Sequence, residues 1–154
     1  MLVEAQVTIA GPRAAVWAAI TDIENAAGII SGIENIEMIE KPASGLVGLR
    51  WRETRQLFGK SATAEKWITD AAENDFYKTR AEDGGFVFLT TKRISEGSGA
   101  VTLTETHESN PQTITAKIMS VPMTLFFKGV LKKAIRQDLQ DIKTAVEQER
   151  PTAA

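Results

Sequence analysis

The sequence predicts an α+β domain in which a curved, seven-stranded antiparallel sheet packs against two short helices and a long C-terminal helix. Three observations support this fold class. From residue 33 to residue 109, apolar side chains follow the period of two that is typical of strands. Short glycine-bearing links join these segments, as in the hairpins of an antiparallel sheet. After Asn110 and Pro111 the apolar spacing changes to three or four residues, which indicates a helix.

The first element is a strand, and two short helices follow it. Leu2 to Ala10 alternates apolar and polar side chains, as a half-buried strand does. Pro12 ends this strand and suits the first turn of a helix, which we expect over Ala14 to Ile20. A capping residue comes next, so the pattern predicts a second short helix that runs to about Ile30.

Six further strands are predicted between this helical segment and the tail. Glycine, proline or polar turn residues separate them. Their predicted ranges are 33–40, 46–58, 61–70, 76–81, 86–95 and 100–109. The order of elements favours a two-layer packing with the helices on one side of the sheet.

The tail from Thr113 to Gln148 predicts one long amphipathic helix. Some 30 helical residues make a rod of roughly 45 Å, which is long enough to cross a domain of this size. Pro122 predicts either a bend or a late start, because proline disrupts a helix interior. The predicted apolar stripe comprises Ile118, Val121, Leu125, Leu131, Ile135, Leu139, Ile142 and Val146.

Composition restricts the possible functions. The 154 residues, 43% hydrophobic and 25% charged, predict a single domain over 1–150 with a frayed tail over 151–154. A net charge of −2 without charged blocks gives no support to a nucleic-acid partner. The absence of cysteine excludes thiolate chemistry, and a single histidine excludes a histidine-cluster metal site, so we expect neither metal nor cofactor. The N-terminus lacks a signal-peptide pattern and no uninterrupted apolar run reaches membrane-spanning length, so a cytoplasmic chain without an integral membrane segment is predicted.

A small set of polar residues falls on the apolar side of two predicted strands. In strands 46–58 and 100–109, one alternate set of side chains is apolar except at Glu53, Arg55, Glu105 and His107. Buried charges are costly unless they are paired, so these residues have three possible roles. They form structural or solvated pairs, they anchor a ligand head group, or they act as the acid and base of a reaction.

The N-terminal half of the tail helix differs in composition from its second half. It is rich in Met and Phe, which suit the wall of an adaptable apolar pocket but also an ordinary core. We therefore expect residues 118–130 to cover a cavity and residues 131–146 to anchor the helix. The pattern of strand 61–70 does not decide which of its faces turns inward. The predicted ligand-binding residues are Trp51, Tyr77, Phe88, Leu103, Met119, Met123, Phe126, Phe127 and Val130.

Two segments resemble a known group of proteins. Ile9 to Asn25 contains a strand end, a helix with Val-Trp and a Thr-Asp turn, and Val47 to Arg55 matches a third-strand pattern. The chain thereby resembles the Bet v 1-like, or START-like, helix-grip superfamily. More narrowly it resembles the SRPBCC group of polyketide cyclase/dehydrase and lipid-transport proteins. This resemblance implies a cavity between the sheet and the long helix for apolar or amphipathic molecules.

The resemblance implies binding or transport of a hydrophobic or amphipathic small molecule, either lipid-like or a polyketide or aromatic compound. The sequence does not decide between a carrier and an enzyme, nor does it give the ligand or the oligomeric state. The alternative is a cofactor-independent cyclase or dehydratase that acts on a polyketide-like substrate. A third role, in protein interaction, would use an apolar patch around Ala26 to Ile30.

Overall fold

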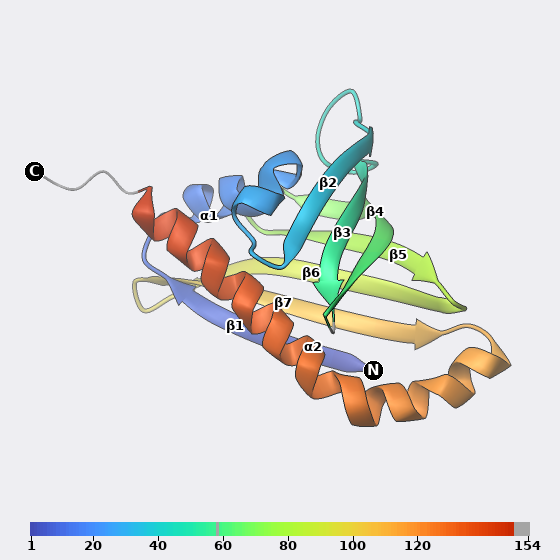
Figure 1. Ribbon diagram of the computed structural model, residues 1–154. Coiled ribbons are helices and arrows are strands. Elements are labelled where there is room, and N and C mark those ends of the chain that lie inside the picture. Colours follow the sequence, from blue (N-terminus) through green and yellow to red (C-terminus); the bar gives the residue numbers. More distant parts are fainter. Residues whose placement is uncertain (58, 150–154) are drawn as a thin grey trace, which may run out of the picture.

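The computed structural model describes residues 1–57 and 59–149 as a sheet layer and a helix layer (Figure 1). The predicted frayed tail over 151–154 lies outside these described residues. The helices are α1 (Arg13–Thr21), the 3₁₀ helix η1 (Ile23–Gly28) and α2 (Ile114–Gln148). The strands are β1 (Leu2–Ile9), β2 (Ile33–Glu40), β3 (Arg50–Leu57), β4 (Lys60–Ala72), β5 (Phe76–Asp83), β6 (Phe86–Gly97) and β7 (Ala100–Pro111).

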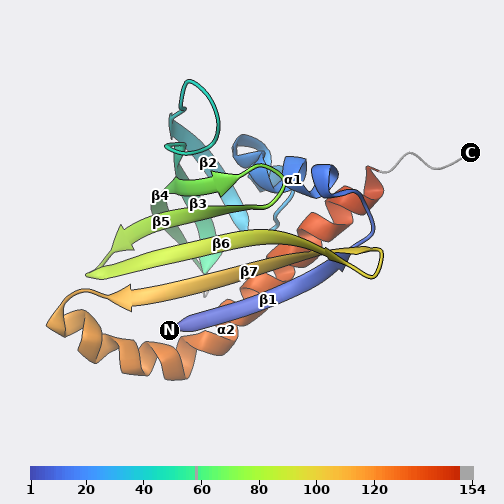
Figure 2. The same cartoon turned by 180° about the vertical axis from the view of Figure 1, so that it is seen from behind.

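The seven strands form one sheet in the order β1-β7-β6-β5-β4-β3-β2, and every neighbouring pair is antiparallel. β1 pairs with β7 over its whole length, from Leu2 opposite Glu108 to Ile9 opposite Val101. The sheet curves around α2, with α1 near the C-terminal end of that helix (Figures 1 and 2). The predicted α+β helix-grip fold is confirmed.

Most strands end one or two residues from their predicted bounds, and two elements differ by more than that. The third strand begins at Arg50 rather than at residue 46, because Gly45 and Gly48 adopt positive φ angles of 71° and 94° and turn the chain. Phe58, the last residue of that predicted strand, lies outside the described residues. The second short helix is a 3₁₀ helix of six residues.

The predicted single stripe on α2 is wrong in its first half. Ile135, Leu139 and Ile142 are buried in the core, as expected, whereas Ile118 and Leu125 are 68% and 74% exposed. The step from Leu125 to the next predicted residue spans six positions. At about 100° per residue, that step moves the row by roughly 240° around the helix. The two halves of the predicted stripe therefore lie on different faces.

The first half of α2 bends away from the line of the second half (Figure 1). Pro122 lies within this half, inside the helix. Proline has no backbone N–H and its ring crowds the preceding turn, which gives a physical cause for such a bend. The alternative prediction of a late start at Pro122 is wrong, because α2 begins before it, at Ile114.

Candidate ligand-binding cavity

A cavity of about 610 Å³ lies between the sheet and α2, within the range of small-molecule sites. Strands β2 to β7 supply its sheet wall, α1 and η1 close one end, and α2 covers it. Exposed residues of β5, Glu82 and Asp83, belong to its rim. This is where the sequence pattern predicted a cavity.

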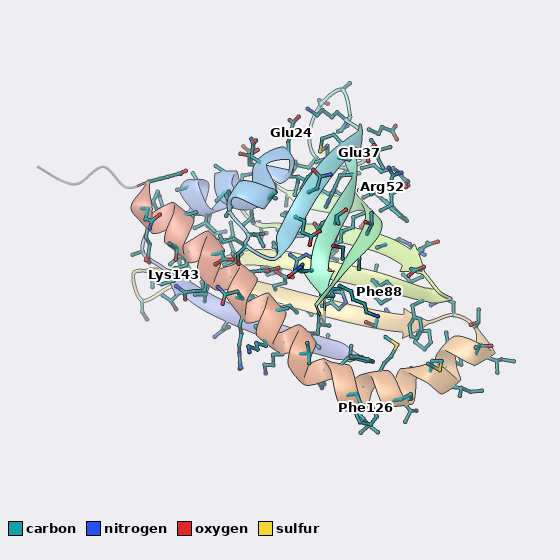
Figure 3. All side chains as sticks on the ribbon, viewed as in Figure 1. Glu24, Glu37, Arg52, Phe88, Phe126 and Lys143 are labelled. Carbon is teal, nitrogen blue, oxygen red and sulfur yellow. The ribbon has the colours of Figure 1, made fainter. Side chains whose placement is uncertain are left out.

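The α2 wall of the cavity contains three of the five predicted lining residues of this helix. Met123, Phe127 and Val130 line the cavity. Met119 and Phe126 do not, because they are 52% and 72% exposed on the flank of the helix. The side chain of Phe126 points away from the sheet (Figure 3).

The sheet wall contains three of the four predicted aromatic and apolar residues. Trp51, Tyr77 and Phe88 line the cavity, whereas Leu103 is fully buried in the core and outside the lining. The Tyr77 hydroxyl donates a hydrogen bond of 3.0 Å to the backbone oxygen of Ile20. This hydroxyl holds α1 against the sheet, so Tyr77 offers the cavity mainly its ring.

Two predicted residues, Glu53 and Arg55, belong to a buried network of charges that joins the sheet to α2. Arg55 Nε lies 2.8 Å from Glu53 Oε2, and Arg55 Nη2 lies 2.5 Å from Asp138 Oδ2 on α2. Lys66 Nζ on β4 lies 2.7 Å from the same Glu53 oxygen. Pairing is what makes such burial tolerable, since an unpaired charge in the interior is strongly destabilising.

The network favours the charged forms of Glu53 and Arg55, whereas burial raises the pKa of Asp138 although Arg55 opposes that rise. Burial opposes the ionisation of Glu53, but Lys66 and Arg55 outweigh it and lower the pKa of this carboxyl to about 2. Burial likewise opposes the charge of Arg55, but Asp138 and Glu53 raise its pKa. At neutral pH Glu53 is therefore an anion that accepts hydrogen bonds and has no proton to donate.

A second pair, Lys92 and Glu105, faces the cavity from cross-strand positions of β6 and β7. Lys92 Nζ lies 3.0 Å from Glu105 Oε2, and although burial opposes the charge of Lys92, Glu105 raises the pKa of its ammonium group. The distance defines an ion pair, yet Glu105 Oε2 makes no hydrogen bond of good geometry within the described residues. The buried Ser109 hydroxyl, which also lines the cavity, likewise has no hydrogen-bond partner there. These oxygens are the ones that a polar group in the cavity would satisfy.

His107 lines the cavity beside these groups. Its Nδ1 lies 3.0 Å from the Thr90 hydroxyl, and its ring stacks on that of Phe88 with centroids 6.0 Å apart. Burial lowers the pKa of His107 to about 4, helped by Lys66 and Lys92 although Glu105 opposes them. The imidazole is neutral at pH 7, so it can exchange hydrogen bonds with a ligand but is a weak base.

All four polar residues singled out from the sequence line one cavity, but their partners were missed. Lys92 is recognisable only once the β6–β7 register is known. The burial of Asp138 could have been predicted, since this acidic residue directly precedes Leu139 of the buried stripe. The sequence pattern left the inward face of β4 undecided, and in the structure Lys66 and Ile68 point inward. Trp67 points to the other face, where the Arg50 guanidinium carbon lies 4.4 Å from the centroid of its ring.

The predicted apolar patch around Ala26 to Ile30 is not present as an exposed surface. Ala26 and Ile30 are both buried and line the cavity. A short helical segment that closes one end of a cavity turns its apolar side chains inward. Most of the large hydrophobic residues exposed in the described part of the chain lie on α2.

Comparisons with solved structures place this architecture among known proteins. The protein TTHA0849 from Thermus thermophilus matches with a TM-score of 0.80 at 16% identity, over 98% of this chain and 100% of that one. A START superfamily protein from Mycobacterium smegmatis matches with a TM-score of 0.73 at 15% identity, over 97% and 99% of the two chains. The Zhui aromatase/cyclase from Streptomyces sp. R1128 matches with a TM-score of 0.72 at 17% identity, over 100% and 98%. At such identities these matches establish the fold.

Sequence comparison establishes the family. No curated protein matches the chain. Residues 2–147, however, match the profile of the family described as "Polyketide cyclase / dehydrase and lipid transport". The resemblance drawn from the sequence is thereby confirmed, and the chain belongs to the polyketide cyclase/dehydrase and lipid-transport family.

Proposed function

We propose that this protein binds or transports a hydrophobic or amphipathic small molecule in the cavity between the sheet and α2. The observation that carries the proposal is the lining of this cavity of about 610 Å³. Apolar side chains such as Met123, Phe127 and Phe88 form one part of its wall. Buried polar groups, which include Glu105, form another. An amphipathic molecule would be held at both of its ends by such a lining.

The charges in the cavity constrain the polar end of the ligand. Glu53 and Asp138 are balanced by Arg55 and Lys66, and Glu105 is balanced by Lys92. Because each of these two buried groups of side-chain charges sums to zero, they offer a ligand hydrogen bonds rather than an unpaired charge. A ligand with hydroxyl or carbonyl groups fits this environment better than one with a net charge, which would enter without a counter-ion. Hydroxylated lipids and polyketide-like aromatic compounds both meet this description.

The proposal is tested by ligand binding with a matched pair of variants. Met123 lines the cavity, whereas Thr124, its neighbour in sequence, is exposed and outside the lining. Native mass spectrometry and organic extraction of the purified protein identify what the cavity retains. Titration with a neutral polyhydroxylated aromatic probe, followed by Trp fluorescence, measures affinity. We expect Met123→Lys to weaken binding by about tenfold or more, because it places a charge against an apolar ligand, and Thr124→Lys to leave binding unchanged. Equal affinities of the two variants would overturn the proposal.

A second candidate function is a cofactor-independent cyclase or dehydratase. It is favoured by Glu105 and His107, which face the cavity from alternate positions of β7, and by structural similarity to an aromatase/cyclase. Such chemistry needs a base to remove a proton next to a carbonyl and an acid to protonate the departing hydroxyl. Glu53 is paired and ionised, and His107 has a pKa of about 4, so neither is tuned for this work at neutral pH.

The two functions separate in one assay. A linear poly-β-ketone thioester is incubated with the wild type and with His107→Gln, and cyclised product and probe affinity are both measured. Turnover by the wild type that is lost in His107→Gln, with probe affinity retained, would establish catalysis over simple carriage. Binding without turnover in either protein supports the carrier function.

A further inference from the structure

The first half of α2 exposes an unusual concentration of apolar side chains. Of the eleven large hydrophobic residues exposed in the described part of the chain, eight lie on this helix between residues 114 and 130. One 18-residue stretch of α2 has a mean hydropathy of 1.3 and only 6% of it is buried. We call the eight residues the apolar surface of α2: Ile114, Ile118, Met119, Val121, Leu125, Phe126, Phe127 and Val130.

The basic side chains of α2 begin in this part of the helix and continue into its second half. Residues 114–137 contain five basic side chains and no acidic one, so this segment carries +5. Because the whole chain carries −2, the remainder carries −7, and the molecule is electrically polarised toward this helix. The basic residues are Lys117, Lys128, Lys132, Lys133 and Arg136.

We propose that the apolar surface of α2 docks on a lipid bilayer that contains anionic lipids, with the helix lying in the plane of the interface. Interfacial helices combine bulky Phe, Leu and Ile side chains with Lys and Arg beside them. The apolar side chains enter the boundary between head groups and acyl chains, while the lysines contact the phosphates. Six of its eight residues lie outside the cavity lining, so docking can be measured apart from what the cavity binds.

Length and composition alone would also allow α2 to cross a membrane, but its packing favours the interface. The second half of α2 is fixed to the sheet by buried Ile135, Leu139 and Ile142. The ion pair between Asp138 and Arg55 fixes it as well. Only the first half therefore has apolar side chains free to enter the lipid, while exposed Lys133 and Arg136 of the second half can still contact the head groups.

A second copy of the chain would be a poorer occupant of this surface. In a two-fold dimer the same patch meets itself, so two segments of +5 would be brought together. Like charges at that distance repel, whereas an anionic bilayer supplies the complementary charge. Charge complementarity thus selects the membrane.

Docking in this way has a geometric consequence for the cavity. Phe127 and Val130 belong to the apolar surface of α2 and also to the cavity lining. The surface therefore reaches the lip of the cavity, and a docked molecule would bring that lip to the bilayer. Figure 3 shows Phe126 on the outer side of this part of α2, and Phe88 of β6, which lines the cavity, on the side of the sheet.

The test is vesicle co-sedimentation of the full chain with two double variants. Ile118→Glu/Leu125→Glu places two acidic residues in the apolar surface. Gln140→Glu/Thr144→Glu makes the same change of charge at exposed positions in the anchored half of the same helix. Vesicles of phosphatidylcholine alone are compared with vesicles that contain about a third phosphatidylserine, and circular dichroism verifies that each variant is folded.

We expect the wild type to bind the anionic vesicles at least about tenfold more tightly than the neutral ones, and about 0.5 M salt to weaken this binding. The Ile118→Glu/Leu125→Glu variant should lose about tenfold or more, and the Gln140→Glu/Thr144→Glu variant should stay within about threefold of the wild type. Failure of the wild type to bind anionic vesicles would overturn the proposal. Equal losses in the two variants would also overturn it. Concentration-dependent association of the wild type that Ile118→Glu/Leu125→Glu abolishes, without vesicle binding, would assign the surface to a second copy instead.

Discussion

Arg55 should be far more important for stability than its position near a cavity suggests. Its guanidinium reaches Glu53 on its own strand and Asp138 on α2, and the side chain of Asp138 is only 7% exposed. In Arg55→Met, Glu53 keeps Lys66 as its partner, but Asp138 loses the only side chain that hydrogen-bonds to it within the described residues. Removing one partner of a buried ion pair typically costs about 3–5 kcal/mol, so we expect a loss of unfolding free energy of that order.

The reverse change should cost less. Asp138→Leu leaves Arg55 paired with Glu53, so no charge loses all of its partners. We expect this variant to lose about 1–2 kcal/mol. The double variant Arg55→Met/Asp138→Leu removes both members and should be more stable than Arg55→Met alone by about 2 kcal/mol, a favourable coupling.

Urea unfolding followed by Trp fluorescence measures all three variants, and a surface pair provides the control. Arg52 lies on the same strand as Arg55 and pairs with Glu37 at 2.8 Å, but their side chains are 44% and 59% exposed. Arg52→Met should therefore cost less than about 1 kcal/mol. If Arg55→Met costs no more than Arg52→Met, or if the double-variant coupling is zero, the view of Arg55 as the link between sheet and α2 is refuted.

Three further predictions concern single residues. The pKa of His107 is about 4 in the folded protein, below its ordinary 6.5. Between pH 4 and pH 6.5 the imidazole therefore takes up a proton when the protein unfolds. Stability should fall by about 2–3 kcal/mol as the pH drops from 6.5 to 4, and His107→Gln should lack this loss in urea titrations. The pKa of Glu53 is about 2 in the folded protein against an ordinary 4.5, so its carboxylate stabilises the fold fully above pH 4.5. This stabilisation, about 3 kcal/mol, should be lost as the pH falls toward 2. In the same urea titrations, Glu53→Gln should lack this dependence of stability on pH. Tyr77→Phe leaves the Ile20 carbonyl without its donor and should cost about 1–3 kcal/mol in thermal or urea unfolding, whereas a loss near zero would contradict the anchoring of α1.

The fold was predictable because it rests on local periodicity. Alternation in the strands, the glycine-bearing links and the change of period after Pro111 each report on neighbouring residues, and together they fix the order of elements. Strand parity was equally informative, since it turned Glu53 and Glu105 toward the same interior. Parity gives the face of a side chain but not its neighbour across the sheet. The pairing of Lys92 with Glu105 depends on register, which is a property of two strands at once.

The long helix shows the limit of periodicity in a second way. Its apolar residues predict one stripe because each step but one has helical spacing, and the exception near Lys128 resembles a small irregularity. In the structure this step separates two rows with different surroundings, one packed on the sheet and one facing solvent. A hydrophobic pattern records that a face is apolar. It does not record whether protein, ligand or lipid covers it.

The architecture of the cavity explains why the first half of α2 has an apolar inner row but not why it has an apolar outer one. Where the helix spans the cavity, only residues such as Met123 and Phe127 can contact its interior. A helix that merely covered a cavity would carry polar residues on its outer side, as amphipathic helices of soluble proteins do. Instead Ile118, Val121 and Leu125 face solvent there. Folding the domain does not require these three side chains to be apolar, and neither does enclosing a ligand. The requirement must come from a surface outside the molecule, and the five basic residues of segment 114–137 indicate that this surface is anionic.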